Sequence, residues 1–105
     1  MSGKLNAINL ASSTPAILYA NLTVSPSTVT ISLCNKSTAT ASIRVAVVDG
    51  IAIDDVRDAD YIEYDFPIAS RNVLERTAIV LGQNQSIYVF SNIASVSAVV
   101  WGFTG

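Results

Sequence analysis

The sequence predicts an all-β fold, an antiparallel β-sandwich of about seven to eight strands with jelly-roll or immunoglobulin-like topology. Three observations support this prediction. Val, Ile and Thr make up 31 of the 105 residues, and β-branched side chains favour strands over helices. Apolar and polar residues alternate with a period of two in several segments. Turn-forming residues separate these segments at a spacing of roughly ten residues, which is typical of sandwiches.

The clearest alternation lies in TVTISL, residues 28–33, and it recurs in SIRVAV, residues 42–47. In the second segment Ile43, Val45 and Val47 are expected to point inward. The polar residues 35–40 between the two segments predict that they form a hairpin. The other expected strands are residues 16–24, 60–66, 73–81, 85–91 and 96–103.

A chain of 105 residues is expected to form one domain. We assign residues 16–105 to a single β-sandwich domain and residues 1–15 to an N-terminal arm that is free to dock elsewhere. The first ten residues, MSGKLNAINL, lack the apolar core of a signal peptide, so secretion by the general route is not expected. Asn-x-Ser/Thr tripeptides begin at Asn21, Asn35 and Asn84, and we interpret them as chance matches to the glycosylation pattern.

Charge is scarce in this chain: 50% of the residues are hydrophobic and 13% are charged, against about 25% charged in an ordinary globular domain. No run of apolar residues is long enough for a membrane-spanning helix, so no membrane partner is expected. The apolar excess therefore predicts surface that is covered in a homo-oligomer. The net charge of −2 argues against nucleic acid as a partner.

The last two expected strands carry apolar residues on both faces. SIYVFS, residues 86–91, places two apolar residues on each face, and VSAVVWGF, residues 96–103, places three on each face. Such strands are normally covered on both sides. One cover is the sandwich core, and a neighbouring subunit is our candidate for the other, with a loop or the N-terminal arm as alternatives. The expected interface residues are Tyr88, Phe90, Val96, Val100, Trp101 and Phe103.

Several kinds of catalytic or metal site are excluded by composition. The chain has no His, so a Ser-His-Asp or Cys-His arrangement cannot form, and a zinc site is not expected with a single cysteine. Cys34 is expected to act as a small apolar side chain. No phosphate-binding or dinucleotide-binding motif occurs, so we expect no cofactor. For the acidic segment 49–60, a solvated loop is favoured over a cation site.

The most chemically suggestive stretch is DYIEYDFPI, residues 60–68. Alternation places Ile62, Tyr64 and Phe66 on the expected core face, with Glu63 and Asp65 outside. A glycan-active enzyme that uses Glu63 and Asp65 is the alternative from another class. We favour structural charge pairing instead. The residues expected to take part in this pairing are Glu63, Glu75, Arg76 and Arg44.

The four tyrosines are spread over several expected strands. A carbohydrate-binding platform is one use for them, and packing in the core or at an interface is the use that we favour. They are Tyr19, Tyr61, Tyr64 and Tyr88.

Four segments, taken in order and spacing, resemble a small β-domain that recurs in tailed phages of marine and freshwater bacteria, including cyanophages. They are SLCNKSTATASIRVAV, DYIEYDFPI, NVLERTAIVLGQNQSIYVFS and VSAVVWGF. The match as a whole spans roughly residues 28–103. The resemblance implies a non-enzymatic structural role in the virion and transfers no catalytic residue. Since the chain is almost nothing but this domain, we expect a capsid decoration (cement) subunit. A tail, neck or fibre component that contacts the host or a glycan is the alternative.

The partners expected from this resemblance are other copies of the chain and other virion proteins, such as a major capsid protein. A trimer is the expected oligomer, because trimers are common at the three-fold positions of capsids. The expected localisation is the virion.

Overall fold

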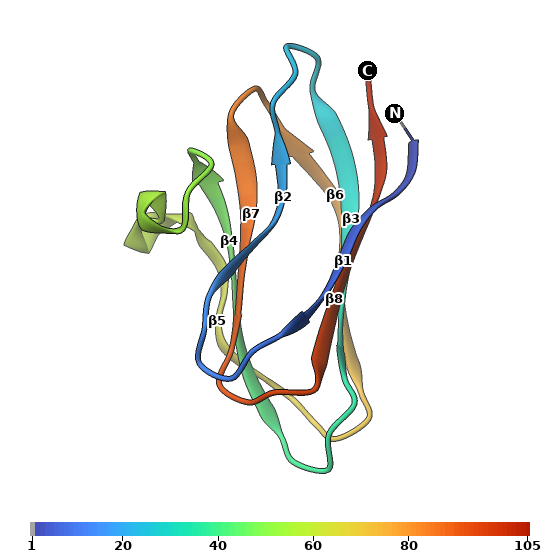
Figure 1. Cartoon of the computed structure of the whole chain (residues 1–105), viewed down its shortest axis with the longest axis vertical. Coiled ribbons are helices and arrows are strands. Elements are labelled where there is room, and N and C mark those ends of the chain that lie inside the picture. Colours follow the sequence, from blue (N-terminus) through green and yellow to red (C-terminus); the bar gives the residue numbers. More distant parts are fainter. Residues whose placement is uncertain (1) are drawn as a thin grey trace.

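The computed structural model describes residues 2–105, which form eight β-strands and two short 3-10 helices (Figure 1). The strands are β1 (Ser2–Leu10), β2 (Ala16–Asn21), β3 (Ser27–Asn35), β4 (Ala41–Asp49), β5 (Tyr61–Ile68), β6 (Val73–Leu81), β7 (Gln85–Ser91) and β8 (Val96–Thr104). The helices η1 (Ile53–Asp55) and η2 (Asp58–Asp60) lie between β4 and β5. Within this range no helix has the length and apolar character needed to cross a bilayer.

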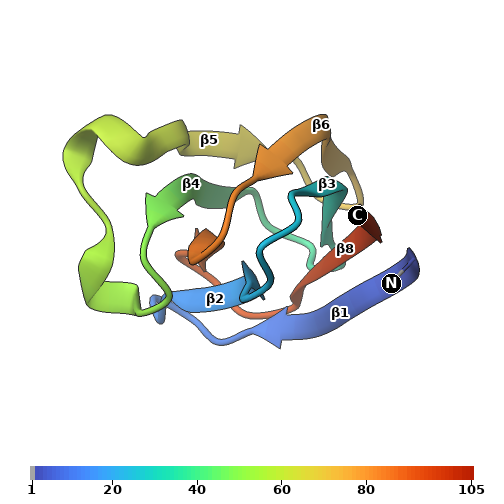
Figure 2. The same cartoon turned by 90° about the horizontal axis from the view of Figure 1, so that it is seen from above.

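The strands build two four-stranded sheets that pack face to face, as the view from above shows (Figure 2). The first sheet has the order β1-β8-β3-β6, and the second has the order β2-β7-β4-β5. Each strand pairing is antiparallel. The predicted antiparallel β-sandwich is therefore confirmed.

The strand pairing is nested. β1 pairs with β8, β2 with β7, β3 with β6 and β4 with β5, so the chain is one long hairpin wound around a common core. Pairing of β3 with β8 and of β4 with β7 then completes each sheet. This is the order of an eight-stranded jelly roll. Of the two topologies that the sequence left open, the chain adopts the jelly roll.

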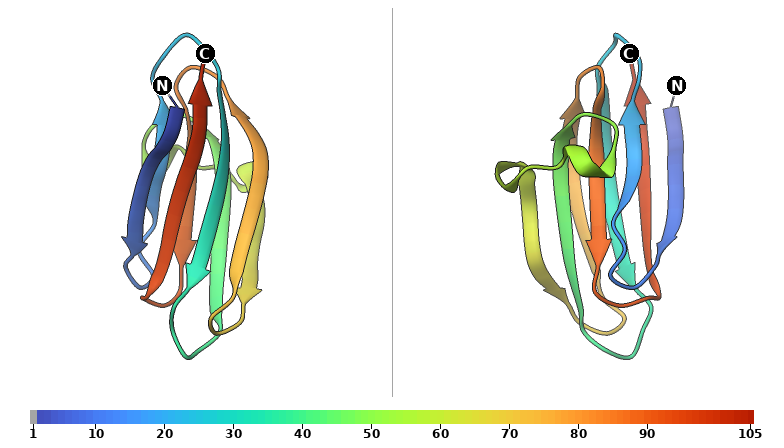
Figure 3. Two further views of the ribbon diagram at one scale, coloured as in Figure 1. Left: turned by 90° about the vertical axis from the view of Figure 1, so that its right-hand side faces the viewer. Right: turned by 60° about the vertical axis from the view of Figure 1, so that its left-hand side comes forward.

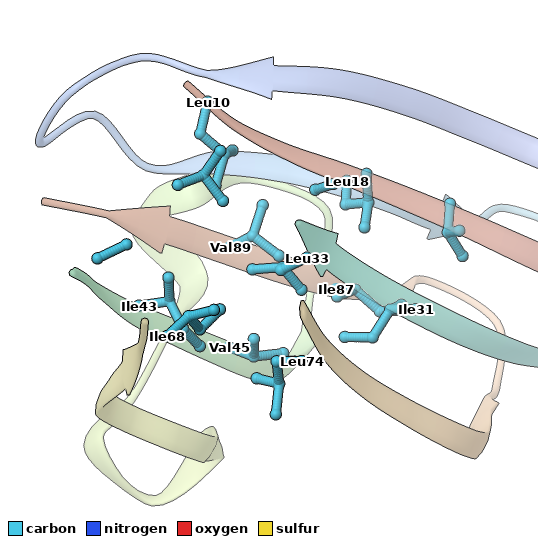
Figure 4. Close-up of a cluster of buried hydrophobic side chains, with 14 of the residues drawn as sticks. Leu10, Leu18, Ile31, Leu33, Ile43, Val45, Ile68, Leu74, Ile87 and Val89 are labelled. Atoms are coloured by element: carbon cyan, nitrogen blue, oxygen red, sulfur yellow. The ribbon is translucent and has the colours of Figure 1, made fainter. Parts of the chain in front are cut away.

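The core lies between the two inner faces and follows the alternation of the strands (Figure 4). In β3 the apolar side chains of TVTISL are buried and the Thr and Ser side chains between them are half-buried. Each large side chain that leaves water contributes roughly 1.5–3 kcal/mol. The fully buried leucines and isoleucines are Leu18, Ile31, Leu33, Ile43, Leu81 and Ile87.

The predicted hairpin between residues 28–33 and 42–47 is wrong. β3 belongs to the first sheet and β4 to the second, so residues 36–40 cross from one sheet to the other. Alternation identifies the face of a strand that meets the core. It does not distinguish two strands that lie side by side from two strands that face each other across the core.

Most of the expected N-terminal arm, residues 1–15, is instead a strand of the sandwich. β1 pairs with β8 from Ser2 opposite Phe103 to Leu10 opposite Val96. Leu10 is buried, and Leu5 and Ile8 pack against the core. The sandwich therefore begins with β1 rather than at residue 16, whereas Met1 lies outside the described residues. The register shifts between Lys4 and Asn6, and this irregularity hides the period of two in KLNAINL.

Two buried asparagines fix the loops that connect one sheet to the other, and each does so with an equivalent set of hydrogen bonds. Asn21 ends β2, and its side-chain amide donates to the carbonyl oxygens of Ser25 in the following loop and of Leu81 at the end of β6. Its side-chain oxygen accepts from the backbone N–H and hydroxyl of Thr23. One side chain thus fixes the loop and joins the second sheet to the first.

Asn35 repeats this arrangement at the end of β3. Its amide donates to the carbonyl oxygens of Ala39 and of Ile68 at the end of β5. Its oxygen accepts from the backbone N–H and hydroxyl of Ser37. Both asparagines are fully buried, so neither is open to glycosylation in the folded protein, and the two Asn-x-Ser/Thr matches are structural loop motifs.

Candidate functional site

β5 carries the acidic and aromatic residues of DYIEYDFPI, and two bulges decide where its side chains point. Its register against β4 shifts between Ile43 and Val45 and again between Val45 and Ala46. Asp65 lies in the stretch opposite the first shift and has a positive φ of 51°. Because a bulge inserts a residue, it moves the side chains that follow to the other face.

The expected core face of this strand is therefore wrong. Ile62, Tyr64 and Phe66 are 44%, 58% and 38% exposed. Glu63, which we expected to point outward, lies opposite the buried Val45. β5 is also an edge strand of its sheet, so fewer neighbours are available to cover its side chains than a central strand would have.

Glu63 forms an ion pair with Arg76 of β6, which belongs to the other sheet. Arg76 lies opposite the buried Ile31 and so reaches in from the first sheet. Its guanidinium also lies 6.0 Å from the centre of the Phe66 ring. The structure thus brings Glu63 and Arg76 together as a bridge that closes the edge of the sandwich between β5 and β6.

Arg44 pairs with Asp65, the second carboxylate that the sequence analysis placed on the outer face. Its Nε donates to Asp65 Oδ1 at 2.7 Å on the outer face of the second sheet, and this hydrogen bond raises the pKa of Arg44. Glu75 does not join either pair through its carboxylate, because only its carbonyl oxygen accepts a hydrogen bond from Arg76. Of the four expected charge-pairing residues, Glu63 and Arg76 therefore pair with each other, Arg44 pairs with Asp65, and the Glu75 carboxylate joins neither pair within residues 2–105.

The expected interface residues also separate. Val96 and Val100 are completely buried in the core of this chain, so they cannot contact a neighbouring subunit. Trp101 and Phe103, on the opposite face of β8, are 37% and 53% exposed. The sequence showed that β8 is apolar on both faces, but one of those faces is the core.

Tyr88 was another expected interface residue, and the chain itself covers it. Tyr88 packs on the outer face of the second sheet with Ala46 and Val48. Val56, from the segment between β4 and β5, covers this cluster together with Tyr61 and the half-buried Phe90. A loop of the same chain is thus the cover for this face, which was one of the alternatives to a neighbouring subunit.

An aromatic patch results on the outer face of the second sheet, and we define it as Tyr61, Tyr64, Tyr88 and Phe90. The Tyr61 ring lies edge to face with Tyr64 at 5.0 Å between centroids and with Tyr88 at 5.9 Å. The guanidinium of Arg44 lies 4.2 Å from the centre of the Tyr64 ring and 5.2 Å from that of Phe90. The patch therefore already holds one cation against its rings.

A depression of about 410 Å³ adjoins the patch and is lined by Asp58, Tyr61 and Tyr64. Asp58 comes from η2, in the segment that stands out from the second sheet in the right-hand view of Figure 3. The volume lies in the range of small-molecule sites. Two tyrosines of β5 and one aspartate of η2 thus line one open space.

Two other carboxylates of the acidic segment hold the backbone. Asp55 accepts a hydrogen bond from the backbone N–H of Ala52, and Asp60 accepts one from that of Arg57, so each closes its own 3-10 turn. Asp49 accepts a hydrogen bond from the side chain of Gln85. Across residues 2–105 no group of three or more His, Cys, Asp or Glu side chains is placed to hold a metal ion.

Burial shapes the acid–base behaviour of Tyr88. Loss of solvent raises the pKa of its phenol to about 12, and the neighbouring Tyr61 contributes a smaller effect in the same direction. Tyr88 therefore stays neutral at physiological pH. It supports the patch as a packed ring rather than as an acid or base.

Glu63 and Asp65, the carboxylates of the enzymatic alternative, point away from each other. Glu63 bonds to Arg76 in the opposite sheet, whereas Asp65 bonds to Arg44 on the outer face. A glycosidase needs two carboxyl groups that flank one bond. This pair does not provide that arrangement.

Asp58 is the residue of the depression that sequence reasoning missed. The acidic segment and the tyrosines were both noticed, but their spacing in the chain did not indicate that η2 folds back beside Tyr61. Val56, an isolated apolar residue among charged neighbours, was the available signal, since its packing anchors the segment to the sheet. No protein-family model, curated protein or solved structure matches the chain.

Proposed function

We propose that the chain is a non-enzymatic structural protein of a phage virion, and specifically a capsid decoration subunit that packs through the outer face of its first sheet. Its partners are other copies of the chain and virion proteins such as a major capsid protein. The resemblance of residues 28–103 to phage β-domains is the reason for proposing a role in the virion. The apolar, weakly charged outer face of the first sheet supports assembly with other proteins.

That surface is the side of β1, β8, β3 and β6 that faces away from the core. Trp101 and Phe103 stand exposed in its middle, on β8. Phe103 lies opposite Thr28, and Thr28 lies opposite the exposed Val80, so apolar and small polar side chains run across three strands. The charged side chains on these strands at this face are Lys4 and Glu75. A broad, weakly charged face is typical of a surface that another protein covers.

The fold is compatible with this role but does not assign it. Jelly rolls occur in viral capsid proteins and in lectins, among others, and function resides in sites rather than in folds. The separation of Glu63 from Asp65 supports the non-enzymatic part of the proposal.

Size-exclusion chromatography with light scattering tests assembly. We expect the wild type to elute as an oligomer, with a trimer as the specific expectation, and Phe103→Lys to elute as a monomer with an unchanged circular dichroism spectrum. Val24→Lys is the matched control, because Val24 is 84% exposed in a loop and should leave the oligomer intact. A wild type that stays monomeric at high micromolar concentration would contradict assembly through this face.

A reconstruction of the virion tests the location. A decoration subunit should lie on the outside of the capsid lattice, with the outer face of its first sheet against a neighbouring protein. Density for the chain on the tail or neck would replace the decoration role with the second candidate.

The second candidate is a tail, neck or fibre component that contacts a glycan of the host. It predicts an exposed aromatic surface, and Tyr64, at 58% exposure beside Tyr61, supplies one. Binding of the isolated domain to a glycan array, lost in Tyr64→Ala, is the expected result for this candidate. An array without signal would leave the decoration role as the remaining virion function.

A further inference from the structure

We infer that the depression lined by Asp58, Tyr61 and Tyr64 binds an organic cation, of the alkylated ammonium or guanidinium class. Cation binding at this place does not depend on assembly through the first sheet, because the depression lies on the outer side of the second sheet.

The first reason is the arrangement of the aromatic walls. Tyr61 and Tyr64 stand at 80° to each other, with 5.0 Å between their centroids. The face of an aromatic ring is electron-rich and attracts positive charge, and sites that bind alkylated ammonium groups are lined by such rings.

A second reason is Asp58, an acidic residue that lines the same space. Asp55 and Asp60 accept hydrogen bonds from backbone N–H groups, whereas Asp58 begins η2 and lines the depression. A carboxylate beside two rings supplies the counter-charge that an organic cation needs. The wider surroundings have the same sign, since residues 53–60 contain four aspartates and one arginine.

Arg44 provides an internal example of the same chemistry. Its guanidinium lies 4.2 Å from the Tyr64 ring centre, and Asp65 neutralises it at 2.7 Å. A bound cation would make the same kind of contacts in the neighbouring depression. Asp58 would supply the counter-charge that Asp65 supplies to Arg44, and Tyr61 would be a second ring. Because Arg44 is paired with Asp65, it does not oppose a second cation as an unpaired arginine would.

Charge complementarity also decides between ligand classes. A phosphate or carboxylate ligand would meet Asp58 and the other carboxylates of the loop, and like charges repel. A neutral sugar gains ring stacking and hydrogen bonds, but nothing from the negative surroundings. A compact ammonium such as that of lysine is strongly hydrated, whereas guanidinium and alkylated ammonium groups leave water more easily.

The expected affinity is modest. The depression is open, and cation–π attraction is weaker at an exposed site than at a desolvated one. Two rings and one carboxylate at such a site support dissociation constants in the millimolar range. Such a site suits a ligand presented at high local concentration, either as many free molecules or as a side chain of a partner held nearby.

Titration of the full chain by NMR tests the inference, with the ring signals of the four tyrosines as the readout. Choline chloride is the alkylated ammonium probe and arginine amide is the guanidinium probe. The neutral isostere 3,3-dimethyl-1-butanol controls for shape without charge, and a methyl glucoside represents the sugar class. We expect choline or arginine amide to shift the signals of Tyr61 and Tyr64, with a dissociation constant at least fivefold lower than that of the neutral isostere.

The two cationic probes separate the sources of the ligand. Preference for choline indicates a free or lipid-borne alkylated ammonium, and preference for arginine amide indicates an arginine of a partner protein. Either preference supports the inference. Shifts that are equal for choline and its neutral isostere, shifts caused by the glucoside alone, or no shift at Tyr61 and Tyr64 would each overturn it.

Two aspartate variants give the matched control. Asp58→Asn should weaken choline binding about three- to fivefold, because it removes the carboxylate that lines the depression. Asp54→Asn removes an identical charge from η1, outside the lining, and should change binding by less than about 1.5-fold at physiological salt, where screening is strong. Equal weakening by both variants would show diffuse attraction to the loop instead of a site. Exposed aspartates were chosen so that folding is preserved, and backbone NMR spectra check this directly.

Discussion

At the scale of single residues, buried polar side chains decide where this chain turns. Asn21 and Asn35 each use both ends of the amide, one to hold the following loop and one to reach the last carbonyl oxygen of a strand in the other sheet. A backbone carbonyl that is buried without a donor costs about 1–3 kcal/mol. These two side chains therefore remove penalties that the crossings would otherwise impose.

Asn35→Ala should lower the free energy of unfolding by about 3 kcal/mol, because the carbonyl oxygens of Ala39 and Ile68 lose their donor and Ser37 loses its acceptor. Equilibrium unfolding in urea measures the change. Asn9→Ala is the control, since the Asn9 side chain bonds only to the exposed side chain of Lys36, and its effect should stay within about 0.5 kcal/mol. Equal losses for the two variants would contradict the role of Asn35.

A second residue-scale prediction concerns Gly102, where β8 passes close to β3. Its φ is +151°, and an added β-carbon would lie 2.8 Å from Val29 Cα and closer still to the Thr28 carbonyl oxygen. Gly102→Ala should therefore lower stability by about 2–4 kcal/mol, as backbone atoms have to move apart. Thermal unfolding of this variant beside Gly82→Ala checks it, because a β-carbon at Gly82 meets only ordinary contacts.

At the scale of elements, the strands with unbroken alternation were predictable, whereas the place of β1 and the core face of β5 were not. β3, β4 and β7 keep the period of two, so their inward residues followed from sequence alone. β5 carries two register shifts and β1 carries one. A bulge depends on pairing with another strand, and no pattern within DYIEYDFPI or KLNAINL reveals it. The core face of β5 and the place of β1 were missed for this one reason.

The same bulges give the two acidic residues of β5 different energetic roles. The Glu63 side chain is 11% exposed and bridges to Arg76, whereas that of Asp65 is 49% exposed. Glu63→Gln should lower the free energy of unfolding by about 1 kcal/mol, because it leaves a half-buried guanidinium without its counter-charge. Asp65→Asn should change it by less than about 0.5 kcal/mol. Urea titrations of both variants compare them, and a larger loss for Asp65→Asn would be inconsistent with these positions.

At the scale of the whole molecule, the nested hairpin was beyond the reach of local patterns. Alternation, turns and composition predicted a sandwich, but the choice of partners is made by the fold, as the mistaken hairpin between β3 and β4 shows. Local patterns likewise revealed only the part of the candidate site that lies within one strand. Tyr61 and Tyr64 stood out in the sequence, whereas Asp58 joins them only because the segment between β4 and β5 packs back on the sheet.

The packing of that segment gives a pH dependence for the whole domain. The pKa of Tyr88 rises from 10.0 to about 12 on folding, so the unfolded chain loses this proton first as pH increases. Stability should be at its full value below pH 10 and fall between pH 10 and about 12, by at most about 1.4 kcal/mol per pH unit for this group. Urea titrations across this pH range give the free energy of unfolding of the wild type and of Tyr88→Phe, and the difference between the two isolates the contribution of Tyr88. Parallel curves for the two proteins would contradict the assignment.

The pairing of β1 with β8 has a consequence for how the chain connects to anything else. Ser2 lies opposite Phe103, so both ends of the chain leave from one pole of the molecule, beside the loop held by Asn21 (Figure 1). A tag or fused domain at either end would therefore project from this pole and leave the loop held by Asn35 free at the other. The two ends also lie close enough for a short linker to join them, which makes the domain suited to circular permutation with new ends at the distal loops.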